Sequence, residues 1–87
     1  MEFAPRNLGV FVCSHVFKRK RPILLVSHDD GDWQCLCGGS DHGNDAHLVG
    51  VGHLIDDDPS LNECADLPVD WCAERDSPGA TWRRSKL

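Results

Sequence analysis

The chain has 87 residues and a formal net charge of −5; 40% of its residues are hydrophobic and 26% are charged. Three tryptophans and three phenylalanines can seed a core, so the composition excludes a disordered chain, and the length predicts a single domain. Glycine and proline recur along the chain and exclude a coiled coil, while every apolar run is far shorter than the roughly 18–20 residues of a membrane-spanning helix.

The first half of the chain predicts three β-strands. Residues 10–17 and 22–28 are rich in β-branched and aromatic side chains, and the basic run between them fits a solvated turn. Both faces of 10–17 are substantially apolar, which is typical of a central strand. Asp29-Asp30-Gly31-Asp32 is a turn signal because its glycine readily adopts positive φ, and residues 33–37 then return as a third strand. We expect these strands to form an antiparallel meander.

The second half predicts a further strand and a short helix. Residues 47–52 are expected to be a strand or a strand-like entry to a helix. Two helix-start signals then overlap: Asp58 can cap a helix whose first residue is Pro59, or Ser60 and Glu63 can form a capping box. A proline at position 68 ends the helix after barely two turns.

The last segment predicts a hairpin. Residues 69–74 are expected to be a strand, and Ser77-Pro78-Gly79 a turn before 81–83. The segments together predict an α+β fold, a small antiparallel sheet of four or five strands with one or two short helices packed on it. We expect one domain over residues 1–87, with the basic residues 83–87 as a tail that need not be ordered.

The stretch from residue 47 to residue 82 carries a family resemblance. It reads His47-Leu-Val-Gly-Val-Gly-His-Leu-Ile-Asp-Asp-Asp-Pro-Ser-Leu61, followed by Leu67-Pro68, Trp71-Cys-Ala-Glu-Arg75 and Trp82. This pattern resembles a family of small bacterial domains of unknown function that is distantly similar to the immunity proteins of polymorphic toxin systems. The resemblance implies an α+β fold and binding of a partner protein. The extra cysteines and histidines and the short length depart from the immunity pattern.

The cysteines predict both a cellular compartment and a candidate metal site. Five cysteines cannot all form intrachain disulfides, and the N-terminal residues make a poor signal peptide, so we expect a reducing cytoplasm. Cys13 and His15 lie two residues apart, as do Cys35 and Cys37, and neighbouring strands would bring these two pairs together. Zinc takes about four such ligands. His42 and His47 complete this constellation. Against zinc stand the absence of a C-x-x-C motif and the frequent role of cysteine as a small core residue.

Other chemistry is less well supported by the sequence. The consecutive acids at 29–32 and 56–58 lack the alternating oxygen ligands and distant glutamate of a calcium loop, and turn or capping roles explain them. The chain contains no nucleophile elbow, no phosphate-binding glycine loop and no H-E-x-x-H motif, and it is short for a deep pocket. We therefore expect no enzyme activity and no cofactor, with zinc as the alternative.

The charges are separated along the sequence and predict a binding partner. Residues 27–76 contain 13 of the 14 acids but a single base, Arg75, while the other eight bases lie nearer the ends. Either the ends pair with the acidic middle, or an acidic face steers a basic partner. Nucleic-acid binding and membrane binding are not expected, since the acidic bulk of the domain repels phosphate.

Two hypotheses follow from the sequence. The first is a non-enzymatic, immunity-like interaction domain that presents an acidic face and an aromatic anchor to an unknown, basic protein. Its expected contact residues are Asp56, Asp57, Asp58, Trp71, Arg75 and Trp82. The second is a small zinc-stabilised domain that binds the metal through Cys13, His15, Cys35 and Cys37.

Overall fold

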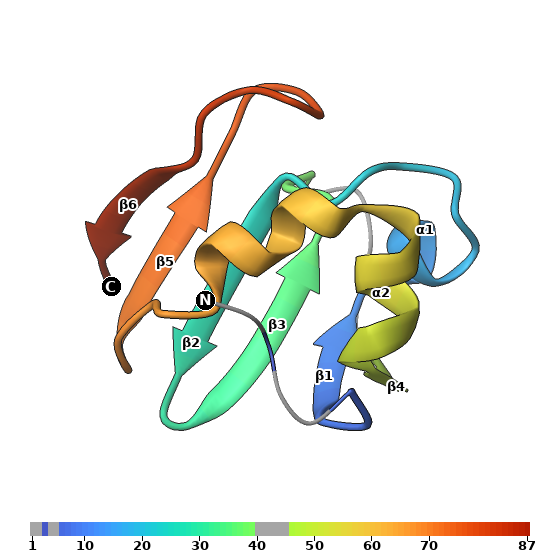
Figure 1. Cartoon of the computed structure of the whole chain (residues 1–87), viewed down its shortest axis with the longest axis horizontal. Coiled ribbons are helices and arrows are strands. Elements are labelled where there is room, and N and C mark those ends of the chain that lie inside the picture. Colours follow the sequence, from blue (N-terminus) through green and yellow to red (C-terminus); the bar gives the residue numbers. More distant parts are fainter. Residues whose placement is uncertain (1–2, 4–5, 40–45) are drawn as a thin grey trace.

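A computed structural model of the 87-residue chain describes residues 3, 6–39 and 46–87. In this part of the chain, six strands form one mixed sheet in the order β4-β1-β3-β2-β5-β6 (Figure 1). The strands are β1 (Gly9–Val12), β2 (Leu25–Asp29), β3 (Asp32–Leu36), β4 (His47–Gly50), β5 (Trp71–Glu74) and β6 (Arg83–Lys86). The helices are α1 (Ser14–Phe17), α2 (Val51–Asp57) and the 3₁₀ helix η1 (Pro59–Cys64). The predicted α+β class is confirmed, and none of the described helices has the length and apolarity needed to cross a membrane.

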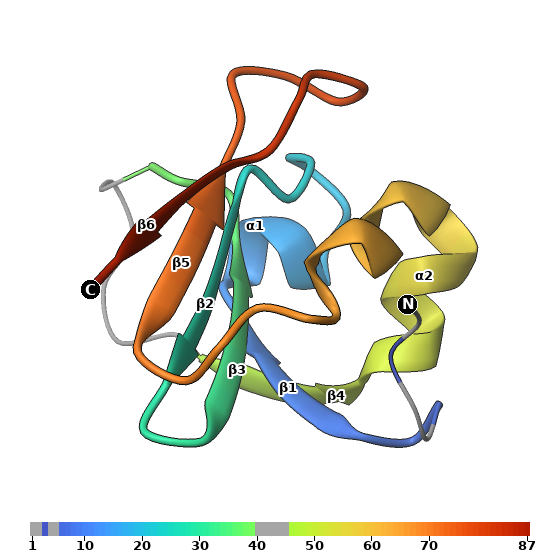
Figure 2. The ribbon, with the colours of Figure 1, turned by 60° about the vertical axis from the view of Figure 1, so that its left-hand side comes forward.

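The core lies between one face of the sheet and the helices that cover it (Figures 1 and 2). Val12 of β1 pairs with Cys35 of β3, which pairs with Val26 of β2, which pairs with Ala73 of β5. All four of these side chains have no exposed area. This continuous row across four strands is the centre of the core. Val51 and Leu54 of α2 lie three residues apart, on one face of that helix, and are buried with the row.

The first three strands do not form the predicted antiparallel meander. β2 and β3 do pair antiparallel, and the turn between them has positive φ at Asp30 and Gly31, as the turn signal indicates. β1, however, pairs parallel to β3 and antiparallel to β4, so it is an interior strand without a hairpin to β2. The sheet thus has six strands and is partly parallel, in place of the four or five antiparallel strands expected.

The strand expected over 10–17 ends at Val12 because the chain then enters the short helix α1. Cys13 has extended backbone angles, and the amide of Phe17 donates to its carbonyl oxygen at 2.9 Å, which closes a helical turn. The β-branched Val16 is helical despite its strand propensity, because α1 buries it in the core. Tertiary packing outweighs intrinsic propensity over so short a segment.

The helical segment after β4 begins earlier than the capping signals indicate. α2 covers 51–57, and the signal at Asp58 instead starts η1, where the Asp58 carboxylate accepts from the Ser60 amide at 3.2 Å and Pro59 occupies the first turn. The expected final hairpin is present as β5 and β6, with Gly79 at φ +85° in the turn region. Residues 83–86, expected to belong to a tail, form the edge strand β6.

Candidate functional site: a cysteine–histidine cluster

Three potential metal ligands meet where β1 and β3 end. The ligand atoms of Cys13, His15 and Cys37 all lie within 4.8 Å of one another. We call these three residues the Cys/His cluster. Among the described residues, this is the one group of three or more His, Cys, Asp or Glu side chains spaced closely enough to hold a metal ion.

The parallel pairing of β1 with β3 places these residues together. Val12 is opposite Cys35, so the next residue of the first chain segment, Cys13, lies at the same end of the sheet as Cys37. Cys13 caps the N-terminus of α1, and the helix turns His15 toward Cys37. Immediately after Cys37, Gly38 has φ +80°, a conformation that costs a residue with a Cβ about 1–2 kcal/mol.

The groups around Cys37 favour the thiolate form of its side chain. Its Sγ lies 3.6 Å from Nδ1 of His15 and 4.0 Å from Nη1 of Arg21. Burial raises the pKa of Cys37, but hydrogen bonds from the Gly39 backbone, His15, Cys13 and Arg21 outweigh it and lower the pKa to about 6. These contacts favour the thiolate of Cys37, which is the form that binds metals and acts as a nucleophile.

Cys35, expected as the fourth member of this site, lies elsewhere. Its side chain belongs to the buried row of the core, whereas Cys37 lies beyond the end of the strand beside α1. Burial, with the nearby Cys64, raises the pKa of Cys35 to about 12. Two residues along a strand span about 6.5 Å, so Cys37 lies at the sheet end of the core and Cys35 lies farther inside it.

The other predicted ligands do not join the cluster. His47 stacks on Phe17, with ring centroids 4.3 Å apart, at the edge of the sheet. His42 lies outside the described residues. Arg21, by contrast, contacts Cys37, although the sequence placed it only in a solvated turn. The two residues are sixteen positions apart and no spacing motif links them, so their contact depends on the fold alone.

The acidic run that was expected to face a partner is paired within the chain. Arg6 binds Asp56 at 2.7 Å and Arg19 binds Asp57 at 3.0 Å, both on the surface. The third acid of the run, Asp58, binds the buried Arg75 at 2.5 Å. Cations from the N-terminal part of the chain thus reach the acidic middle, as one of the two interpretations of the charge pattern expected.

Arg75 and the two tryptophans of the expected contact set take different positions. The Arg75 side chain has no exposed area and donates to the carbonyl oxygen of Ile23 and to Ser60. Its guanidinium also lies 4.2 Å from the ring centroid of Trp82. Trp71 is half-buried on β5, opposite His28 of β2. Arg75 is therefore held by internal contacts, and the role of the other residues in partner binding stays a prediction.

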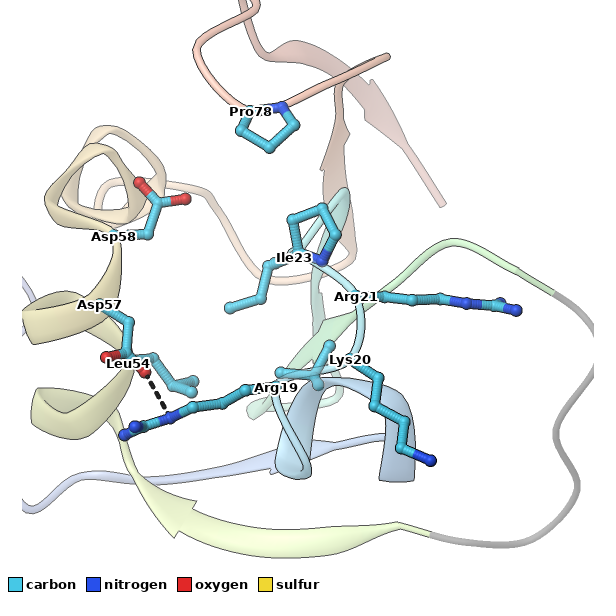
Figure 3. Close-up of a pocket in the computed structure, with 10 residues that line it drawn as sticks. Arg19, Lys20, Arg21, Ile23, Leu54, Asp57, Asp58 and Pro78 are labelled. Atoms are coloured by element: carbon cyan, nitrogen blue, oxygen red, sulfur yellow. Dashed lines mark ion pairs between the residues drawn. The ribbon is translucent and has the colours of Figure 1, made fainter.

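A pocket of about 370 Å³ lies on the side of α1 that faces α2 (Figure 3). Arg19 crosses toward Asp57, and their ion pair borders the pocket, whereas Lys20 and Arg21 extend away from it (Figure 3). Apolar and acidic side chains form the rest of the lining: Val16, Pro22, Ile23, Leu54, Asp58 and Pro78. Its volume is in the range of small-ligand sites, and its two lining carboxylates, Asp57 and Asp58, are already engaged in ion pairs.

Comparisons with known proteins found no matching family model, no matching curated protein and no matching solved structure. The resemblance to small bacterial domains and immunity proteins accordingly remains a prediction from sequence. The geometry of the Cys/His cluster is the observation from which a function can be argued.

Proposed function

We propose that this protein is a small zinc-binding domain whose metal ligands are Cys13, His15 and Cys37. Two thiolates and one imidazole are a ligand set that zinc favours over the harder divalent ions. The two thiolate charges balance the charge of one Zn²⁺. Because a bound metal needs its cysteines deprotonated, the lowered pKa of Cys37 reduces the cost of proton release on binding.

The main support for the proposal is the distance between Cys37 Sγ and His15 Nδ1. A tetrahedral zinc with Zn–S of about 2.3 Å and Zn–N of about 2.0–2.1 Å separates the sulfur and nitrogen ligands by about 3.6 Å. The observed separation between Cys37 Sγ and His15 Nδ1 is 3.6 Å. All three ligand atoms lie within 4.8 Å of one another, so a metal requires side-chain adjustments of about 1 Å or less.

The proposed metal has a clear structural consequence. Cys13 and His15 belong to the start of α1, whereas Cys37 follows β3. α1 has only four residues, which is far below the length at which a helix is stable by itself. A metal bound to both segments would fasten this helix to the sheet, and its binding free energy would add to the stability of the fold.

The test measures metal stoichiometry on the reduced protein. Metal-free protein is titrated with Zn²⁺ under native mass spectrometry, and separately with Co²⁺, whose absorption reports thiolate ligation and tetrahedral geometry. We expect one metal per chain with thiolate-to-cobalt charge-transfer absorption. Cys37→Ser and His15→Gln should each weaken binding by at least tenfold, since each removes one of three ligands.

Cys72→Ser is the matched control. Cys72 is the half-exposed cysteine of β5, and its sulfur lies 3.3 Å from Ser85 Oγ, outside the cluster. Its removal lowers the cysteine count equally and should leave the affinity unchanged. Equal losses in Cys72→Ser and Cys37→Ser, or a metal-free protein at saturating Zn²⁺, would contradict the proposal.

A further inference from the structure

The fold divides four of the cysteines into two pairs of opposite character. Cys13 and Cys37 lie side by side in the Cys/His cluster, and hydrogen-bond donors surround the second sulfur. Cys35 and Cys64 both belong to the core, where their side chains have no exposed area. Burial is the main cause that raises the pKa of Cys35 to about 12 and that of Cys64 to about 11. All four side chains are buried, and the two pairs differ in that the Cys37 sulfur has His15 and Arg21 within 4.0 Å.

We propose that Cys13 and Cys37 are a redox-reactive pair, in which a hydroperoxide oxidises Cys37, Cys13 closes a disulfide with it, and the bound metal is released. The release step rests on the proposed zinc binding, whereas the disulfide itself requires only the two thiols. We assign Cys37 as the attacking sulfur because two hydrogen-bonding groups lie beside it, Nδ1 of His15 at 3.6 Å and Nη1 of Arg21 at 4.0 Å. Cys13 is the resolving thiol because its sulfur lies within 4.8 Å of the Cys37 sulfur.

The local backbone permits the bond. The two sulfurs lie within 4.8 Å of each other, so they must approach by no more than about 2.8 Å to reach the S–S length of about 2.05 Å. Neither residue lies inside a regular element: Cys13 caps α1, and Cys37 follows the last residue of β3. Gly38 comes directly after Cys37 and has the widest conformational freedom of any residue. A small displacement of the chain ends therefore suffices.

The chemistry balances with a hydroperoxide as the oxidant. The Cys37 thiolate attacks the outer peroxide oxygen, the O–O bond breaks, and one proton converts the leaving alkoxide or hydroxide to an alcohol or water. Cys37 is then a sulfenic acid. The Cys13 sulfur displaces the hydroxyl group of that acid, which leaves as water after gaining a proton, and the S–S bond forms. Two electrons pass from the two sulfurs to the peroxide.

Disulfide formation removes the charges that hold the metal. Thiolates are the ligand form of cysteine, and a disulfide sulfur carries no charge. Of the three proposed ligands, only the His15 imidazole would remain, and one imidazole does not retain Zn²⁺ against water and buffer. Oxidation and zinc binding therefore exclude each other at this site, and a dithiol reductant should restore binding.

The experiment treats the zinc-loaded and the metal-free protein with hydrogen peroxide. A chromogenic chelator follows zinc release, a thiol reagent counts free cysteines, and peptide mass spectrometry locates the bridge. We expect the five thiols to fall to three, with one zinc released per bridge between Cys13 and Cys37. Addition of a dithiol and zinc should return both signals to their starting values.

Variants separate this inference from the proposed function. In Cys13→Ser, peroxide should oxidise Cys37 but no disulfide should form there. Cys72→Ser should respond like the parent chain. If the protein binds zinc but keeps it, with five thiols intact in excess peroxide, the redox inference is overturned and zinc binding stands. A bridge at Cys35, Cys64 or Cys72 also overturns it. If the protein never binds zinc, the proposed function and the release step fail, while the thiol count in metal-free protein still decides the disulfide.

Discussion

Single residues in this protein take their chemical character from what surrounds them. Cys37 and Cys35 are two positions apart, yet the pKa of the first falls to about 6 and that of the second rises to about 12. The difference comes from hydrogen-bond donors: Cys37 receives them from His15 and Arg21, while Cys35 lies among apolar side chains. Alternation along a strand predicts a shared face for these two residues and says nothing of donors.

Asp58 illustrates the same point for a carboxylate. It joins η1 to the buried Arg75 and also accepts from Ser60. Burial raises the pKa of Asp58, but the hydrogen bonds from Ser60 and the hydrogen bond and charge of Arg75 outweigh it, so its pKa is lowered. A carboxyl with a lowered pKa stabilises the fold above its unfolded pKa of about 3.9, and that stabilisation is lost as the pH falls through the folded pKa.

The Asp58→Asn variant tests this linkage. It should unfold at lower urea than the parent chain at pH 7, because Arg75 would remain buried without its counter-charge. The difference in the free energy of unfolding should shrink as the pH is lowered below about 4, where the parent carboxylate is protonated. Asp76→Asn is the control, since Asp76 pairs with Arg83 on the surface and should have little effect on the urea midpoint. A difference independent of pH would contradict the linkage.

At the scale of elements, the secondary structure of short segments depends on the segments that pack or pair with them. Residues 14–17 have strand propensity but form α1, because the helical turn buries Val16 against Ile23 and Leu54. The basic segment 83–86 has no apolar pattern and forms β6, because β5 has an edge to which it pairs. Arg84 also reaches across to Asp66 at 2.5 Å and to the carbonyl oxygen of Glu63. These contacts join residues that are far apart in the sequence, so no local sequence pattern predicts them.

Deletion of residues 83–87 tests whether β6 is part of the fold. Its loss removes several backbone hydrogen bonds, each with a net contribution of about 0.5–1.5 kcal/mol, and leaves β5 as an open edge. We expect a lower urea midpoint and faster hydrogen exchange in residues 71–74. Arg84→Gln, which keeps the strand but removes the ion pair with Asp66, should leave the exchange of β5 slow. Unchanged exchange after the deletion would mean that 83–87 behave as the expected tail.

At the scale of the whole molecule, ion pairs join charged residues that are separated along the sequence. Arg6 and Arg19 from the N-terminal part bind acids of α2, and Arg83 and Arg84 bind Asp76 and Asp66. These surface pairs contribute little energy individually. A net charge of −5 nevertheless remains, so the molecule keeps an acidic excess. The interaction hypothesis therefore keeps its electrostatic basis, without Arg75 among its accessible contacts.

Zinc should stabilise the whole fold if it binds at the Cys/His cluster. A ligand that binds only the folded state adds about 2.7 kcal/mol at a free concentration of about 100 times its Kd. For a domain of this size, that corresponds to a rise in Tm of roughly 10–20 °C. Thermal melts with Zn²⁺ and with a chelator measure the shift, and Cys37→Ser should show a shift of about half that size or less. If the Tm of the parent chain were the same with and without zinc, the coupling between metal binding and folding would be contradicted.

The sequence by itself determined the α+β class, the turn at Asp30 and Gly31 and the final hairpin, and it offered the cap at Asp58 as one of two alternatives. It also indicated three members of the Cys/His cluster, through the spacing of Cys13 and His15 and the position of Cys37. These features depend on neighbouring residues, whose conformational preferences are local.

Only the tertiary structure decided the parallel pairing of β1 with β3, the exclusion of Cys35 and the contact of Arg21 with Cys37. Each depends on which distant segments pack together, and that choice is made by burial of the row through Val12 and Val26. Local patterns cannot specify it, because the free energy of burying apolar area belongs to the assembled core and to no single segment.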